Sequence, residues 1–264
     1  MVCRRERSSY LGPALFLTFG LSAACVLAAA PNPGGPRVAP PKTRLILATA
    51  TTGGTYYPVG VAIATLTTRE LEGPQGISLT AISSAGSGEN LQLLKNREAD
   101  LAIIQSLFGV MARQGRGRYQ DLPQTYLRSI AILWDNFDHV AGRTRYVRSG
   151  DMSDLENLRR KNFSIGRRGS GTEMSGRVIL EALGFDPAGD FKLQYLGYTP
   201  SAQALQNGRI AGMNIPAGPP ASAITQAVAA IGAEGVRILE FTDAQLEAVN
   251  AAYPVWRRAV IRSG

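Results

Sequence analysis

The chain has 264 residues, of which 45% are apolar, so it can form one large domain or two smaller ones, each with its own core. Its formal net charge is +8, and half of that charge lies within residues 1–43. The remainder is only mildly basic and has no stripe of Lys and Arg, which argues against a nucleic-acid-binding protein.

The N-terminus has the pattern of an export signal. Residues 1–7 are basic, a continuous apolar stretch of about 20 residues follows, and residues 31–43 form a Pro/Gly-rich linker. Such a stretch is also just long enough to span a bilayer, so residues 1–30 are either a signal peptide or a membrane anchor. The sequence around Cys25 leaves lipid attachment open. We therefore expect a periplasmic protein, either free, anchored or lipidated.

Few residues in the sequence are suited to catalysis or metal binding. Both cysteines, Cys3 and Cys25, lie in the export segment, so the rest of the chain has no thiol for a disulfide, a metal site or a nucleophile. His139 is the only histidine, and we expect it to have a structural role because no triad partners can be placed beside it. The spacing of Asp135, Asp138 and Glu89 fixes no carboxylate pair. We expect no catalytic residue, no metal and no cofactor.

From Arg44 onward, β-rich runs alternate with amphipathic helical runs. The pattern predicts helices over 58–71 and 88–99, and strands over 44–50, 76–82, 100–106, 126–134 and 139–147. Strands separated by helices favour a parallel sheet with crossover helices. The first half of the chain is therefore predicted to be an α/β unit.

A second α/β series follows a short helix, in which Ser153 and Glu156 have the spacing of a capping box. Strands are predicted over 163–169, 191–197, 210–216 and 236–241, with helices between them and a last helix capped by Thr242 or Asp243. The two series have the same order of elements. We therefore expect two lobes around a cleft: lobe I (44–138), lobe II (139–238) and a return toward lobe I (239–264).

Three Gly-rich loops, 52–57, 84–90 and 167–173, each join a strand to a helix. Backbone N–H groups and the helix dipole favour an anion at such a position, and the hydroxyls of Thr52, Thr55, Ser170 and Thr172 would add donors. One such loop is equally consistent with an ordinary turn. Three at equivalent places indicate one shared site at the carboxyl ends of the strands. None is followed by the Gly-Lys-Ser/Thr of a P-loop.

Two pairs of residues beside these loops leave alternatives open. Arg167 and Arg168 either strengthen an anion site or form a solvated pair at its rim. Tyr56 and Tyr57 are adjacent and cannot share one helix face, so we expect one in the core and one in the cleft.

Five segments together resemble one known family, the TAXI proteins, which are extracytoplasmic solute receptors associated with TRAP transporters. The segments are "TGGTYYPVG", "GSGENLQLLKNREADLAIIQS", "GRRGSGTEMSGRVILEALG", "AGPPASAI" and "YPVW". They match in order and spacing from about Arg44 to Trp256. The resemblance implies a type II periplasmic-binding-protein fold in a monomer. It also implies capture of a small organic acid, a carboxylate or an amino acid, for the membrane subunits of a TRAP transporter.

The resemblance also implies a set of ligand-binding residues: Gly54, Thr55, Tyr56, Tyr57, Ser87, Asn90, Gln105, Ser106, Ser170, Gly171 and Thr172. The chain departs from the family at Ser106 and Gly212, where an acidic residue is usual, and at Arg167 and Arg168, which replace a more neutral pair. Family members continue for several elements past Gly264, so we expect C-terminal elements to be missing. The alternatives are a ligand-sensing partner of a membrane receptor and an enzyme acting on small anions.

Overall fold

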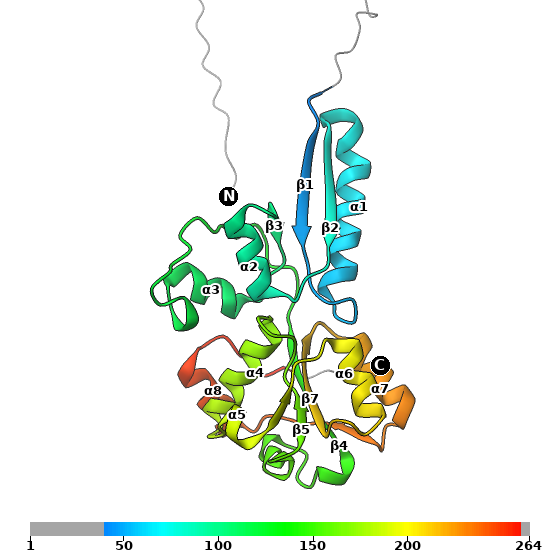
Figure 1. The fold of residues 1–264 in the computed structure, drawn as a ribbon, viewed down its shortest axis with the longest axis vertical. Helices are drawn as coiled ribbons and strands as arrows, with labels where there is room; N and C mark the ends of the chain where they lie inside the picture. The colour runs from blue at the N-terminus through cyan, green and yellow to red at the C-terminus, as the bar shows by residue number, and fades with distance from the viewer. Residues whose placement is uncertain (1–39, 260–264) are drawn as a thin grey trace, which may run out of the picture. The chain divides into compact units, whose positions relative to one another are not determined.

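A computed structural model describes residues 40–259 of the chain (Figure 1). The predicted export segment and both cysteines lie outside these residues. The strands are β1 (Thr43–Ala48), β2 (Ile77–Ile82), β3 (Leu101–Ala102), β4 (Phe137–Arg143), β5 (Asn162–Ser164), β6 (Lys192–Gln194), β7 (Gly212–Ala217) and β8 (Val236–Ile238). The α-helices are α1 (Tyr56–Gln75), α2 (Ser87–Asn96), α3 (Ser106–Gln114), α4 (Gly171–Ala182), α5 (Pro187–Asp190), α6 (Tyr198–Gln206), α7 (Ser222–Ile231) and α8 (Asp243–Ala252). Short 3-10 helices are η1 (Gly117–Tyr119), η2 (Thr144–Tyr146) and η3 (Met152–Leu158).

Lobe I is built on a parallel sheet of three strands in the order β2-β1-β3. Helix α1 runs alongside β2 and β1 and buries a small core around Leu47, Ala64, Leu79 and Ile103 (Figure 1). Parallel neighbours with a helical crossover are what the alternation of patterns predicted. The carboxyl ends of β1 and β3 therefore open onto the same edge of the sheet.

The predicted strand 126–134 is wrong, because these residues have no regular structure. Ile130 and Ile132 are 82% and 89% exposed, although their sequence is typical of a strand. A strand forms only where a neighbour completes its hydrogen-bond ladder. Among residues 40–259, this segment pairs with no strand, and β3 is paired over only two residues.

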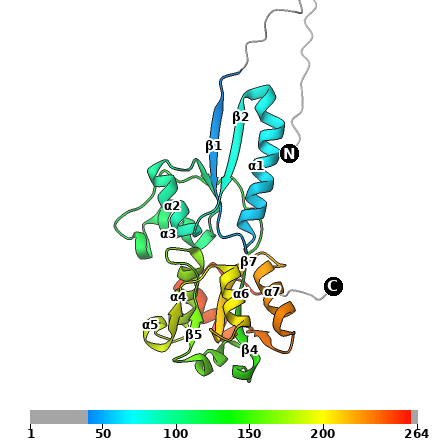
Figure 2. The ribbon, with the colours of Figure 1, turned by 45° about the vertical axis from the view of Figure 1, so that its right-hand side comes forward.

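Lobe II is built on a mixed sheet of five strands in the order β6-β5-β7-β4-β8. Strand β5 is parallel to β6 and β7, and β4 is antiparallel to β7 and β8. Helices α4 and α5 lie on one side of this sheet and α6 and α7 on the other, as both views show (Figure 2). Each face carries its own core, one around Phe163 and Ile179 and one around Leu205 and Met213.

The chain passes between the lobes near β4 and again after α8. Strand β4 starts at Phe137 and belongs to the sheet of lobe II. After α8, Tyr253 and Trp256 pack against the core of lobe I that contains Leu107 and Phe108. These two side chains therefore connect the segment after α8 to the core of lobe I.

Helix boundaries differ from the predicted ones where a different residue supplies the cap. Helix η3 is capped by Asp151, whose carboxylate accepts from the Ser153 N–H at 2.7 Å, so the predicted Ser153–Glu156 box is wrong. Asp151 directly precedes the first residue of η3, so it occupies the N-cap position, from which a side chain can accept from the N–H two residues further on. Ser153 therefore lies inside the helix. At α8 the prediction is confirmed, since Thr242 caps the helix and forms a capping box with Gln245. No helix in the described part of the chain is long and apolar enough to cross a membrane.

Candidate ligand-binding site

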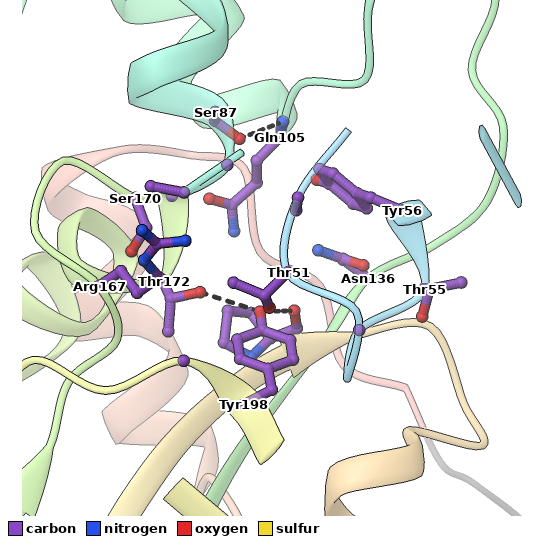
Figure 3. Close-up of a pocket in the computed structure, with 17 residues that line it drawn as sticks. Thr51, Thr55, Tyr56, Ser87, Gln105, Asn136, Arg167, Ser170, Thr172 and Tyr198 are labelled. Atoms are coloured by element: carbon purple, nitrogen blue, oxygen red, sulfur yellow. Dashed lines mark hydrogen bonds between the residues drawn. The ribbon is translucent and has the colours of Figure 1, made fainter. Parts of the chain in front are cut away.

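A pocket lies between the two lobes, at the ends of β1 and β7 and beside the Gly-rich loops (Figure 3). Its volume is about 30 Å³, which accepts only a small chemical group. It is lined by Ala50, Thr51, Gly54, Thr55, Tyr56, Ala85, Gly86, Ser87, Gln105, Asn136, Arg167, Ser170, Gly171, Thr172, Gly197, Tyr198 and Pro216.

Four helices begin at this pocket. Tyr56, Ser87, Gly171 and Tyr198 are the first residues of α1, α2, α4 and α6, and all four line it. The first N–H groups of a helix have no partner within the helix, and the helix dipole places partial positive charge there. A pocket at which four such ends converge is suited to an anion.

Among the described residues, Arg167 is the only charged one in the lining. Its neighbour Arg168 instead places its guanidinium 3.7 Å from the ring centroid of Tyr195. The two arginines that the sequence presents as a pair thus have different surroundings. Both arginines are exposed, so Arg167 supplies a positive charge at the solvent-facing side of the pocket, and Arg168 makes a cation–π contact.

Loop 84–90 is held in place by a buried network. Asn90 is fully buried, and its amide donates to the carbonyls of Thr49 and Ile103 at 2.7 and 2.8 Å. Its Oδ1 accepts from the Ser84 hydroxyl at 2.6 Å. These contacts fix the loop to β1 and β3, and they use the hydrogen-bonding capacity of Asn90 within the protein. Asn90 therefore supports the site from outside the pocket lining.

Loop 167–173 is held by its own side chains. The hydroxyl of Ser170 caps α4 by accepting from the Glu173 N–H at 3.1 Å. The Glu173 carboxylate reaches back to accept from the Gly169 N–H at 2.7 Å and also pairs with Arg177 at 3.2 Å. These contacts present Ser170, Gly171 and Thr172 to the pocket.

The two loops approach each other closely. A methyl group at Gly88 would overlap the carbonyl oxygen of Gly169, and one at Gly171 would come within 2.8 Å of the Ser87 hydroxyl oxygen. Only residues without a side chain permit this approach. The loops thus form one continuous wall of the pocket, with residues from both lobes.

Two tyrosines line the pocket. Burial raises the pKa of Tyr56 and of Tyr198 well above the usual value, and the nearby carboxylate of Asp138 adds to the effect in both, so both hydroxyls stay protonated. Tyr56 also packs edge-to-face on Trp134, with ring centroids 5.6 Å apart. The expected division between Tyr56 and Tyr57 is not seen, because Tyr56 joins both the core and the pocket, and Tyr57 is half-buried outside the lining.

The structure brings most of the predicted site residues together. Eight of them line the pocket: Gly54, Thr55, Tyr56, Ser87, Gln105, Ser170, Gly171 and Thr172. Tyr57, Asn90 and Ser106 do not. Ser106 is exposed at the start of α3, and Gln105 directly before it lines the pocket.

Some lining residues were not predicted from the sequence. Tyr198 begins α6 directly after Gly197, which is the same strand–Gly–helix arrangement as in the other loops, so a signal was present. Thr51 directly precedes the predicted 52–57 loop. Asn136 has no comparable signal, because it lies in an irregular segment before β4.

Two ionisable residues, the half-buried Asp138 and the buried His139, lie near the pocket but outside its lining. The indole of Trp256 donates to Asp138 at 2.7 Å, and burial raises the pKa of Asp138 to about 6. A ring nitrogen of His139 hydrogen-bonds the carbonyl of Ile215 at 3.0 Å, and burial lowers the pKa of His139. His139 is thus a buried residue of β4. Residues 40–259 contain no group of three potential His, Cys, Asp or Glu metal ligands.

Two α/β lobes, with a pocket between them at the helix N-termini, define the two-lobed fold of periplasmic binding proteins. A solved structure with this fold is the binding-protein component of an ABC phosphonate transporter from Pseudomonas aeruginosa. It is 10% identical over 80% of this chain and 74% of that one, with a TM-score of 0.50. The chain belongs to the NMT1-like family, whose model matches residues 47–264.

Two further solved structures are similar. The alkanesulfonate-binding protein SsuA from Xanthomonas axonopodis pv. citri is 15% identical over 76% of this chain, with a TM-score of 0.48. The truncated arginine-bound ArgBP from T. maritima is 13% identical over 80% of this chain and 95% of that one, with a TM-score of 0.48. The chain spans about three fifths of the SsuA structures from X. axonopodis (61%) and Escherichia coli (60%).

Proposed function

We propose that this protein is an extracytoplasmic solute-binding protein that captures a small organic anion, a carboxylate or an amino acid, in the pocket described above. One observation carries the proposal: four helix N-termini and Arg167 converge on a pocket to which both lobes contribute. Positive potential without a fixed negative partner in the lining is suited to an anionic ligand. The membership in the NMT1-like family supports the same function.

A binding role fits the lining better than a catalytic one. The lining residues are hydroxyls, amides, backbone and one arginine, and none of them is a carboxylate or histidine that would act as a general base near neutral pH. The two tyrosine hydroxyls keep their protons because burial raises their pKa. The enzyme alternative would therefore have to draw its base from the ligand or from solvent.

The transporter partner is proposed from the sequence resemblance. The five segments that resemble TAXI proteins favour the membrane subunits of a TRAP transporter, whereas several similar solved structures are described as parts of ABC import systems. Gene neighbourhood separates these options: TRAP membrane subunits beside the gene support our proposal, an ABC permease and ATPase contradict it, and a sensor kinase supports a sensing role.

The test of the binding site compares the two adjacent arginines. We expect carboxylic acids, screened by thermal shift against the purified protein, to raise its melting temperature because they bind the folded state. Arg167→Gln is expected to weaken binding by roughly tenfold or more through the loss of a charged hydrogen bond. Arg168→Gln is the matched control, and we expect it to leave the affinity within about twofold. A response to sugars and to no acid would contradict the anion site.

A further inference from the structure

The protons of two hydroxyls in the pocket can be assigned. The Tyr198 hydroxyl donates its single proton to the carbonyl of Pro216 at 2.6 Å. The same hydroxyl lies 2.9 Å from Thr172 Oγ1, and since Tyr198 has no second proton, Thr172 must be the donor of that bond. Both hydroxyl oxygens therefore offer only lone pairs to a ligand (Figure 3).

Two more groups in the pocket are acceptors. The Thr55 hydroxyl donates to the carbonyl of Gly218 at 3.1 Å, so its remaining capacity is also to accept. The side-chain oxygen Oε1 of Gln105 is buried and receives no hydrogen bond from the described residues. A buried acceptor without a donor is costly, and a ligand with a hydrogen-bond donor would remove that cost.

The donors come from other residues. Arg167 provides a guanidinium, and the first turns of α2 and α4 provide backbone N–H groups beside Ser87 and Gly171. The hydroxyl of Ser170 already accepts from the Glu173 N–H and keeps its proton for a ligand. The pocket therefore offers one set of donors suited to an oxyanion and one set of acceptors suited to a donor group.

Charge balance decides which donor group fits. A carboxylate neutralises Arg167, and a hydroxyl on the same ligand donates its single proton to one of the acceptors without adding charge. An ammonium group would also donate, but it would restore a net positive charge in a lining that contains no carboxylate. Asp138 is the carboxyl whose charge acts on both Tyr56 and Tyr198, yet it lies outside the lining and already accepts from Trp256.

Building on the proposed function, we infer that the ligand is a small hydroxy monocarboxylic acid, with its carboxylate at Arg167 and the loop N–H groups and its hydroxyl donating to one of the acceptors Thr172, Tyr198 and Gln105. An acid without the hydroxyl, called the bare acid below, lacks the donor. An amino acid has the donor, but its ammonium group adds a positive charge beside Arg167. A single carboxylate suits the single arginine.

The test uses acids with matched carbon skeletons. Affinities of the purified protein for glycolate, acetate and glycine, and for both lactate enantiomers, propionate and alanine, are measured by titration calorimetry. We expect at least one hydroxy acid to bind roughly tenfold more tightly than its deoxy and amino counterparts. Tighter binding of the amino acid, or of the bare acid, overturns the inference and leaves the proposed function intact. If none of these acids binds, and no other acid in the wider screen binds either, both the inference and the proposed function are overturned.

Variants identify the residues that cause the preference for the hydroxy acid over the bare acid. Thr172→Val removes an acceptor with little change in shape, and we expect the hydroxy acid to lose most of its advantage over the bare acid while the bare acid binds as before. Gln105→Met provides a second, independent removal, and Thr225→Val, in α7 away from the lining, is the matched control. Asp138→Asn is expected to leave the preference unchanged. A preference that survives both acceptor removals, or that disappears with Asp138→Asn, contradicts the inference.

Discussion

Loops 84–90 and 167–173 share the letters Gly-Ser-Gly, but the structure aligns them one residue apart. In both loops a glutamate reaches back four residues to a backbone N–H, Glu89 to Ala85 at 2.5 Å and Glu173 to Gly169 at 2.7 Å. The N-cap residue of each helix directly follows the residue that donates this N–H. It is Gly86 in the first loop and Ser170 in the second. Identical letters therefore take different structural positions.

The difference gives the loops different tasks. Gly86 has φ +116°, a conformation that glycine adopts readily, and no side chain caps α2. That loop is instead fixed by Asn90 and Ser84 beneath it. Loop 167–173 caps its own helix and carries Arg167 to the pocket. Loop 84–90 is therefore held by hydrogen bonds to the rest of its lobe. Loop 167–173 is held by its own side chains, so it is self-supporting, and it carries the positive charge of Arg167.

The largest expected effect tests that dependence of loop 84–90 on its lobe. Asn90→Ala leaves the carbonyl of Ile103 without its donor, and it leaves the Thr49 carbonyl and the Ser84 hydroxyl bonded to each other but without the partner that Asn90 provides. We expect a loss of about 4 kcal/mol in the free energy of unfolding. Urea denaturation measures it. Asn207→Ala, at an exposed position after α6, is the control and should change stability by less than about 0.5 kcal/mol. A loss below about 1 kcal/mol for Asn90→Ala would show that the network is dispensable.

The second effect concerns the connection between the lobes that carry the loops. Burial raises the pKa of Asp138 from 3.8 to about 6, so the folded state binds this proton more tightly than the unfolded state. Asp138 alone should therefore lower the free energy of unfolding by at most about 3 kcal/mol as the pH rises from about 4 to about 6.

The measurement is the difference between the pH profiles of the protein and of Asp138→Asn, since other carboxyls titrate in the same range. The pKa of Asp151 and of Asp154 is lowered by hydrogen bonds, which gives their contributions the opposite sign. Parallel profiles would mean that Asp138 is ionised equally in both states.

The third effect tests the contact between the loops. Gly88→Ala places a methyl group on the Gly169 carbonyl, and we expect the loops to separate at a cost of about 2 kcal/mol in stability. Gly109→Ala, in α3, is the matched control, because among the described residues no heavy atom outside the helix lies within 4 Å of where its Cβ would stand, and it should be neutral or slightly stabilising. Equal melting temperatures for the two variants would contradict the close approach.

The smallest effect compares the two back-bonding glutamates. Glu89→Ala and Glu173→Ala each remove a charged hydrogen bond to the backbone, which should cost about 1.5 kcal/mol. The loss at Glu173 should be larger by about 0.4 kcal/mol because its ion pair with Arg177 is lost too. Chemical denaturation of both variants and of Glu173→Ala/Arg177→Ala resolves the difference. A larger loss of stability in Glu89→Ala than in Glu173→Ala would contradict the conclusion that loop 167–173 is the self-supporting one.

Much of the fold could be predicted because its signals are local. The periodicity of residues 76–82 and 210–216 predicted strands that the structure confirms, and Thr242 was correctly among the predicted caps of α8. The strand over 126–134 failed because strand formation depends on a partner that a single segment does not contain. The short span of β3 has the same cause.

The site was predictable in its loops and less so in its side chains. Ser170 and Thr172 follow a strand and open a helix, a pattern that predicts a ligand-facing position. Asn90 has the same sequence neighbourhood, yet its side chain turns inward to the carbonyls of Thr49 and Ile103. Which way a side chain turns depends on acceptors that lie far away along the chain.

The sequence by itself determined the alternation of strands and helices, the absence of cysteine beyond the N-terminal segment, and the Gly-rich loops at the helix starts, because these depend on residues close together in the chain. Only the tertiary structure decided that Arg167 and not Arg168 reaches the pocket, and that Tyr198 and Thr172 become acceptors. Those outcomes depend on contacts with Tyr195 and with Pro216, which only folding brings within reach.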